Sequence, residues 1–333
     1  YTVGSFRNTI DANPGAGVFL LTSSGQSDIF VSKLDANGNF VWAVRIGGAG
    51  NDIANAITVD NAGRVYVTGS YTGTVDFDPG SGTFNLAGGG AFAFRLDTSG
   101  AFSWAGRIGS GAGNAIAIDL SGNLIIAGDF TGSSDFDPGA GTTTLTSAGS
   151  TDIFVSKFLL DGSFVWTRQL GGAAADSADG MDTDAANNIY TTGYFTGTAD
   201  FNPGGAVNNL TSAGSIDIFV SKLDASGSYV WAVQIGGAGA ESANALTVDG
   251  SGDLLATGNF SGTVDFDPGA SVSNLTSAGS SDIFVVKLTP AGAHTWSRNM
   301  GGTSSDIPSS IVTDAAGGVY TTGYFNGTAD FDP

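Results

Sequence analysis

The motif Asp-Phe-Asp-Pro recurs along the chain and is the pattern best suited to chemistry. Its two carboxylates alternate with an apolar residue, and glycine-rich segments follow most copies. Hard cations such as calcium take six to eight oxygen ligands, which alternating aspartates and loop carbonyls can supply. We therefore identify a candidate calcium site at the aspartates of these motifs: Asp76, Asp78, Asp135, Asp137, Asp200, Asp265, Asp267, Asp330 and Asp332.

The same motif also has a purely structural interpretation. An aspartate side chain accepts backbone N–H groups in turns, Pro-Gly favours a turn, and Phe77 and its equivalents can fill the space between repeats. The motif lacks the third Asp and the following Glu of the familiar calcium loop. The turn interpretation is therefore favoured, although a turn and a calcium site can coexist.

Two further columns of acids recur outside this motif. The first column opens an apolar segment and supplies candidate additional calcium ligands: Asp28, Asp152, Asp217 and Asp282. The second column follows a Gly-rich segment and consists of Asp52, Asp176, Glu241 and Asp306. One repeat is three residues shorter in each of two loops; it has Ala91 in place of the first acid and lacks the second. Because the two segments lost their acids together, we expect the columns to share one environment.

The tryptophans and half of the basic residues also form columns. Tryptophan inside an apolar segment such as FVWAV is more typical of packing between repeats than of a sugar-stacking platform. We expect each cation to pair with a neighbouring Asp, a weak contact when exposed, although cations facing a central axis would bind an anion. The tryptophans are Trp42, Trp104, Trp166, Trp231 and Trp296. The cations are Lys33, Arg95, Lys157, Lys222 and Lys287.

The composition argues against an enzyme. The chain has no Cys, and its single His, His294, has no repeating partner. A thiolate site is excluded, and no Ser-His-Asp set can be assembled with confidence around one His. Carboxylate pairs are a property of the repeat, so choosing one pair as a glycosidase site would be arbitrary.

The elements that position these residues follow a repeat of about 65 residues. The motif prolines stand at spacings of 65, 59, 65, 65 and 65 residues, at Pro14, Pro79, Pro138, Pro203, Pro268 and Pro333. In the second unit, four segments are typical of strands: 56–60, 64–71, 91–97 and 102–108. D-x-x-G turns join the first strand to the second and the third to the fourth.

Four-stranded antiparallel units that repeat and pack face to face predict an all-β propeller. We expect one domain over residues 1–333, with five blades favoured; a fragment of a larger propeller and an open repeat array are the alternatives. If the ring closes, residues 309–324 would pair with residues 28–46. Either residues 1–6 or residues 319–325 would then be a surplus strand.

Segments 27–48, 151–172 and 216–237 (for example SDIFVSKLDANGNFVWAVRIGG) resemble the SBBP-type β-propeller repeat of large secreted and surface proteins of bacteria. The TGxFxGTxDFDPG signature resembles a subgroup of these repeats. The resemblance implies a propeller displayed outside the cell and no shared catalytic residues.

Charge and loop length narrow the function further. A net charge of -20 argues against nucleic acid and anionic membranes as partners, and no apolar run is long enough to insert into a membrane. The loops that follow the Asp-Phe-Asp-Pro motif are long, and long loops on a rigid scaffold commonly bind partners. We predict a non-enzymatic extracellular or cell-surface module that binds protein or glycan or self-assembles. The alternatives are a multivalent carbohydrate-binding propeller and, ranked last, a hydrolase with an axial site.

Overall fold

The computed structural model describes residues 1–332 and contains no helix within them; Pro333, the last of the motif prolines, lies outside the described residues. All pairings between its strands are antiparallel apart from isolated bridges. The contacts divide the chain into two compact units. The first unit comprises residues 1–118, 122–146 and 156–167, and the second comprises residues 119–121, 147–155 and 168–333.

The complete repeats contain the four expected strands, which we name a to d in chain order; the first repeat begins at strand b, and the last has only strands a and b among the described residues. The a strands are β6 (Ile53–Val59), β12 (Ala112–Ile118), β18 (Ser177–Thr183), β24 (Ser242–Val248) and β30 (Ile307–Thr313). The b strands are β1 (Thr2–Phe6), β7 (Val65–Tyr71), β13 (Asn123–Phe130), β19 (Ile189–Phe195), β25 (Leu254–Phe260) and β31 (Val319–Tyr324). The c strands are β4 (Asp28–Leu34), β10 (Gly90–Leu96), β16 (Asp152–Leu159), β22 (Asp217–Leu223) and β28 (Asp282–Leu288). The d strands are β5 (Phe40–Gly48), β11 (Phe102–Arg107), β17 (Phe164–Gly172), β23 (Tyr229–Gly237) and β29 (His294–Gly302).

The strands pair as the sequence predicts. In the first unit, β6, β7, β10 and β11 form one four-stranded antiparallel sheet. In the second unit, β18, β19, β22 and β23 do the same and continue into two further strands. The D-x-x-G turns close as expected: the Gly63 N–H donates to the Asp60 carbonyl, and Gly63 has a φ of +79° that favours glycine. The all-β fold built from propeller-like repeats is confirmed.

The core lies within the b and c strands, which are buried on both faces. Every residue of β7 is buried except Ser70, and β22 follows the same pattern. In the second unit, Phe260, Phe266 and Phe284 pack edge to face or tilted around one centre, with ring centroids 5.0–6.5 Å apart. Phe266 belongs to an Asp-Phe-Asp-Pro motif, so the expectation that this Phe fills space in the core is confirmed.

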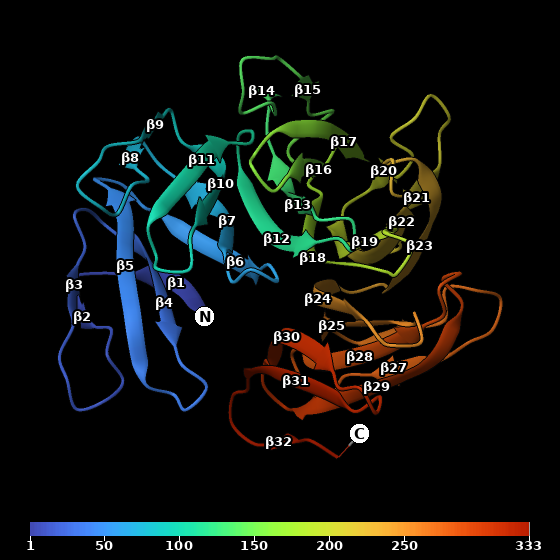
Figure 1. The fold of residues 1–333 in the computed structure, drawn as a ribbon. Coiled ribbons are helices and arrows are strands. Elements are labelled where there is room, and N and C mark those ends of the chain that lie inside the picture. The colour runs from blue at the N-terminus through green and yellow to red at the C-terminus, as the bar shows by residue number, and fades with distance from the viewer. Residues whose placement is uncertain (333) are drawn as a thin grey trace. The chain divides into compact units, whose positions relative to one another are not determined.

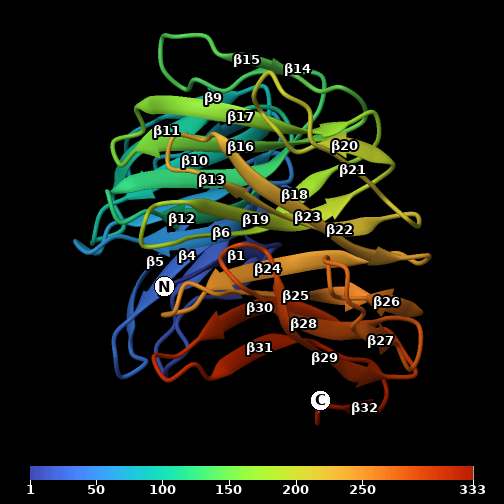
Figure 2. The ribbon, with the colours of Figure 1, turned by 90° about the vertical axis from the view of Figure 1, so that its right-hand side faces the viewer.

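A two-stranded projection, which we call a finger, follows each complete b strand and was not predicted. Each complete finger has two short strands that flank the Asp-Phe-Asp-Pro loop or its variant, and after β31 only the first strand lies among the described residues. The first strands are β2 (Thr9–Asp11), β8 (Thr74–Asp76), β14 (Ser133–Asp135), β20 (Thr198–Asp200), β26 (Thr263–Asp265) and β32 (Ala329–Asp330). The second strands are β3 (Leu20–Thr22), β9 (Asn85–Ala87), β15 (Thr144–Thr146), β21 (Asn209–Thr211) and β27 (Asn274–Thr276). Figure 2 shows β20–β21 and β26–β27 along one edge of the second unit.

The finger strands β8, β20, β26 and β32 also pair with strand d of the preceding repeat, whereas β2–β3 and β14–β15 form separate two-stranded sheets. Asp76 lies in register opposite Gly47, and Asp265 lies opposite Gly236. In the four repeats with this pairing, strand d has strand c on one side and the next finger on the other.

The expected pairing of residues 309–324 with residues 28–46 is wrong. β4 is already paired on both edges, with β1 on one side and β5 on the other, as Figure 1 shows in blue. Residues Thr2–Phe6 therefore take the b-strand position of the first repeat. β31 pairs with β30 in a two-stranded sheet. The blade number and the single domain stay predictions.

Candidate functional site

The aspartates of the Asp-Phe-Asp-Pro motif act as turn caps. Asp76 Oδ1 accepts hydrogen bonds from the Asp78 N–H at 3.0 Å and the Phe84 N–H at 2.8 Å, and Asp78 Oδ1 accepts one from the Gly80 N–H at 2.8 Å. The same bonds recur at the other candidate calcium ligands of this motif: Asp135, Asp137, Asp200, Asp265 and Asp267. At the last copy, Asp330 Oδ1 accepts the Asp332 N–H at 3.0 Å.

The motif by itself fits a turn better than a metal site. One oxygen of each first aspartate is already bonded to two amides, and the second aspartate folds onto its own loop. Within residues 1–332, no three His, Asp or Glu side chains gather in a group that could hold a metal ion. The candidate additional ligands Asp28, Asp152, Asp217 and Asp282 therefore do not join the motif carboxylates in one such group.

The two acid columns, in contrast, meet in pairs, as predicted. A parallel bridge joins the residue before each first acid to the residue before its partner, for example Thr151 to Ala175. Both carboxylates of every pair are at least 99% buried. The four acid pairs are Asp28–Asp52, Asp152–Asp176, Asp217–Glu241 and Asp282–Asp306.

Each acid of a pair caps a different loop. Asp152 Oδ2 accepts the Ala148 N–H at 3.0 Å, and Asp176 Oδ2 accepts the Gly172 N–H at 2.7 Å. Asp176 Oδ1 also accepts the Thr196 N–H at 3.1 Å. The pair therefore joins the loop before strand c, the end of strand d and the end of strand b.

Burial makes the charged form of these acids costly. Desolvation, opposed by amide hydrogen bonds and reinforced by the charge of Asp152, raises the pKa of Asp176 to about 6. Desolvation, with the charge of Asp217 adding to it, raises the pKa of Glu241 to about 7. Burial likewise raises the pKa values of Asp52, Asp152 and Asp282.

In the repeat without an acid pair, the expected position of the missing first acid, Ala91, is wrong. Asp217 lies opposite Phe195 in the sheet register, and the residue opposite the equivalent Tyr71 is Gly90. Gly90, and not Ala91, therefore takes the position of the first acid. A Cβ at Gly90 would lie 2.3 Å from the Gly109 carbonyl oxygen, which leaves no room there for an aspartate.

A strand-d residue beside each acid pair was missed by the sequence analysis. Gln169 and Gln234 each donate through Nε2 to the first acid of their pair at 2.5 Å, and Arg45 contacts Asp28 from the same position. The position varies between Arg, Gln and Asn, so it has no repeating chemical signature. Only the sheet register, which places Arg45 opposite Phe30 and Gln234 opposite Phe219, identifies it.

The tryptophan column packs against the next repeat, as expected. The Nε1–H groups of Trp42 and Trp231 donate to the carbonyls of Thr98 and Pro290 at 3.1 and 3.2 Å, in the turn between strands c and d of the following repeat. In the same turn, Gly292 lies so close to Trp231 that a Cβ would be 3.3 Å from the indole ring.

The cation column follows the expected pairing in part. Lys287 Nζ lies 2.8 Å from Asp249 Oδ2 and 3.1 Å from Asp253 Oδ2, and Lys222 Nζ lies 3.8 Å from Asp184. Arg95 donates instead to the carbonyl of Leu160 at 2.9 Å. His294 begins β29 as a half-buried residue.

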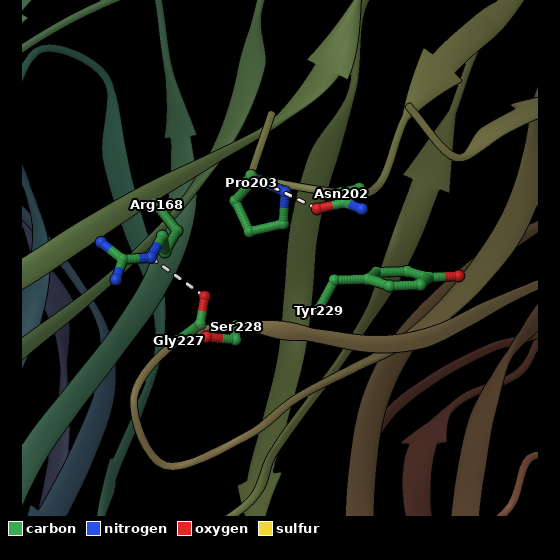
Figure 3. Close-up of a pocket in the computed structure, with 7 residues that line it drawn as sticks. Arg168, Asn202, Pro203, Gly227, Ser228 and Tyr229 are labelled. Atoms are coloured by element: carbon green, nitrogen blue, oxygen red, sulfur yellow. Dashed lines mark hydrogen bonds between the residues drawn. The ribbon is translucent and has the colours of Figure 1, made fainter. Parts of the chain in front are cut away.

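A groove lies between strand d and the next finger in the second unit. One cavity of about 400 Å³ is lined by Arg168, Asn202, Pro203 and Tyr229 among others, and Figure 3 shows their side chains around it. The equivalent cavity one repeat later, of about 430 Å³, is lined by Gln234, Asp265, Asp267 and Pro268 among others.

The two copies of the groove differ in chemistry. Arg168 is fixed at the first, where its Nε and Nη2 donate to the carbonyls of Gly227 and Ser226 at 2.9 Å each. Val233 lines the second copy. The groove therefore repeats in shape, with a basic and aromatic lining in one copy and an acidic one in the next.

Comparison with known proteins identifies the repeat. The family model of the SBBP beta-propeller repeat matches residues 41–73 and 165–202. An uncharacterized WD repeat-containing protein of Acanthamoeba polyphaga mimivirus is 23% identical over 385 residues, which cover 94% of this chain and 27% of that protein. The chain thus spans about a quarter of that relative's length.

A solved structure of a protein of unknown function from Bacteroides caccae also matches the chain. The TM-score is 0.40 at 10% sequence identity, and the match covers 90% of this chain and 94% of the other.

Proposed function

We propose that this chain, which carries SBBP beta-propeller repeats, is a non-enzymatic interaction scaffold displayed outside the cell. The fingers support this proposal because they project from a rigid sheet scaffold and repeat along it. Their loops expose apolar side chains at one position: Val18, Val207 and Val272 are 70–72% exposed. Exposed apolar side chains on otherwise polar loops are the kind of surface that binds a protein partner.

Three properties of the chain support a location outside the cell. It has no Cys, its net charge is -20, and the matched repeat family is one of β-propellers. High net charge keeps a densely displayed protein soluble. In the described part of the chain, the structure contains no helix with the length and apolarity needed to cross a membrane.

The experiment replaces the finger valines. The chain is immobilised and exposed to solubilised bacterial envelope proteins, and a Val207→Ser/Val272→Ser variant is compared with a Thr142→Ser control, which changes the equivalent position of another finger. We expect captured envelope proteins to be lost with the double variant and kept with the control. Equal capture by both variants would contradict a role for the finger tips.

A second candidate is multivalent carbohydrate binding. The groove between strand d and the next finger favours it, because Tyr229 and Pro203 give apolar surface next to the polar Arg168 and Asn202. Shallow sites that repeat gain strength by avidity. A glycan array tests this candidate: binding that Tyr229→Ala abolishes supports it, whereas an array without signal leaves the protein scaffold. Turnover of ester, glycoside or peptide substrates would contradict both candidates.

A further inference from the structure

Three of the acid pairs have two buried carboxylates and no cation beside them. Among residues 1–332, no Lys or Arg lies within ion-pair distance of the pairs Asp152–Asp176, Asp217–Glu241 and Asp282–Asp306. Uncompensated buried charge is strongly unfavourable. Each pair therefore needs either a bound proton or an additional positive charge.

One carboxylate oxygen in each of these pairs has no partner. Asp152 Oδ1, Glu241 Oε1 and Asp282 Oδ1 are buried and accept no hydrogen bond within the described chain. The fourth pair has the same orphan, Asp28 Oδ1, which is the oxygen that Arg45 does not contact. Buried polar atoms are almost always satisfied, and an orphan that recurs in all four pairs indicates a missing partner.

A glycine of strand d lets the carboxylates pack directly against the backbone. A Cβ at Gly171 would lie 2.9 Å from Asp152 Cγ and 2.9 Å from Asp176 Oδ2, so the two acids approach the same point. A Cβ at Gly301 would lie 2.8 Å from the orphan Asp282 Oδ1. A side chain at either glycine would displace the acids.

Backbone carbonyls pack against the loop glycines that lie three residues before the first acids. The Ala148 N–H caps Asp152, and the neighbouring Gly149 is packed so closely against the Ala173 carbonyl that a Cβ would lie 2.1 Å from its oxygen. In the next repeat, the Gly237 and Gly239 carbonyl oxygens lie 2.6 and 2.5 Å from the Cβ position of Gly214. Gly149 is exposed and Gly214 is half-buried.

In the two remaining repeats, an arginine occupies the strand-d position that faces the first acid elsewhere. At Asp28–Asp52, the strand-d residue is Arg45, whose guanidinium contacts Asp28 Oδ2 with a side chain that is 31% exposed. Its equivalents Gln169, Gln234 and Asn299 are neutral. The repeat without acids carries Arg107 at this position, where Nε donates to the Gly89 carbonyl at 2.7 Å.

We propose that the pairs Asp152–Asp176, Asp217–Glu241 and Asp282–Asp306 each bind a calcium ion, and that Arg45 takes the place of the ion at Asp28–Asp52. All available ligands are carboxylate and carbonyl oxygens, the donors that calcium prefers. No thiolate and no imidazole is present in the pairs, so softer metals are poorly served. The ligands of this site differ from the aspartates of the Asp-Phe-Asp-Pro motif, although Asp200 of that motif lies in register opposite Gly171. The proposal does not depend on the proposed scaffold function.

The test counts calcium ions by isothermal titration calorimetry of the chain after removal of metal with EDTA. We expect about three ions per chain, one for each pair without an arginine. Gln169→Arg copies the Arg45 arrangement and should lower the count by one while the fold is kept. Arg45→Gln should raise the count by one. The matched control Asp137→Asn, in an Asp-Phe-Asp-Pro loop, should leave the count unchanged.

The proposal is overturned by any of three results. These are a calcium count that is unchanged in both Gln169→Arg and Arg45→Gln, a calcium count that falls in the Asp137→Asn control, and no calcium binding by a folded chain. In the last case, a melting temperature that rises on acidification without calcium would show that each pair shares a proton instead. Circular dichroism of each variant verifies that the sheets are intact. If an Asp176→Asn variant, which removes a buried acid, fails to fold, Gln169→Arg still tests the proposal because it keeps both acids.

Discussion

Gly171 stands between Asp152 and Asp176, so that a single added methyl group would meet both carboxyl groups at 2.9 Å. The two acids are far apart in sequence and cap different loops: Asp152 accepts the Ala148 N–H, and Asp176 accepts the N–H of Gly172, the residue after this glycine. The absence of a side chain at Gly171 is therefore what allows two acids to be buried together at the end of strand d.

Gly171→Ala is expected to destabilise the chain by at least about 2 kcal/mol, since overpacking alone costs about 1–3 kcal/mol and the φ of +143° adds strain. Gly205→Ala is the matched control, because no atom lies within 4 Å of its Cβ position. Urea denaturation of both variants measures the difference. Equal free energies of unfolding would show that the acid pair moves apart without cost.

The indole of Trp231 is expected to contribute more to stability than that of Trp296. Its Nε1–H donates to the Pro290 carbonyl and its ring packs on Gly292, whereas Trp296 has no such bond among the described residues. Trp231→Phe should cost about 0.5–1.5 kcal/mol more than Trp296→Phe, the net contribution of a typical hydrogen bond. Chemical denaturation of Trp231→Phe beside Trp296→Phe measures this; an equal loss would mean that ring burial alone matters.

Much of the fold is predictable because the strands and turns carry local signals. β7 (VYVTGSY) is β-branched and aromatic, and Asp60 and Gly63 bound its turn with chemistry that requires no tertiary information. The fingers escape prediction because strands of three residues, such as Thr74–Asp76, have too little periodicity to be recognised. Their pairing with Gly47 and Gly48 is a tertiary contact between consecutive repeats.

The sequence predicts that the two acid columns lie together, because the short repeat has lost both acids. The joint loss of two acids in the short repeat is enough to place Asp152 near Asp176. The position of the gap itself, at Gly90, requires the sheet register, which counts back from Arg95 opposite Tyr66. The role of Gln169 could not be inferred, because nothing in the sequence shows which strand-d side chain faces an acid.

Acid is expected to destabilise the chain through its turn aspartates. The Ser226 hydroxyl, with backbone N–H groups of the same turn, holds the pKa of Asp224 below its ordinary value despite some desolvation. A carboxyl with a lowered folded-state pKa contributes stability above its unfolded pKa of about 4, and that stability is lost as the pH falls through the folded pKa. Melting temperatures from pH 6 to pH 2.5 should therefore fall steeply below pH 4.

The variant Asp224→Asn isolates one such turn. The side-chain amide of the asparagine still accepts hydrogen bonds through its oxygen, and it does not titrate between pH 2.5 and pH 6. The difference in melting temperature between the native chain and Asp224→Asn should shrink as the pH approaches 2.5. A difference that stays constant with pH would assign the acid sensitivity to other groups.

The strand pair β30–β31 is expected to bind a further c-type strand along β31. Tyr320 and Phe325 are 58% and 52% exposed, although their equivalents in β19, Tyr190 and Phe195, are fully buried. β19 is covered by the c strand β22, whereas β31 has only β30 as a strand partner among the described residues. An unpaired strand edge with exposed aromatic side chains is a template for strand addition.

A synthetic peptide with the sequence of residues 281–302, a complete c–d hairpin, tests this expectation by fluorescence anisotropy. We expect binding that Phe325→Ser weakens at least tenfold, since burial of a Phe side chain is worth about 1.5–3 kcal/mol. A peptide of scrambled sequence is the control for nonspecific adsorption. Equal binding of the two peptides, or no effect of Phe325→Ser, would show that the β31 edge does not recognise a c strand.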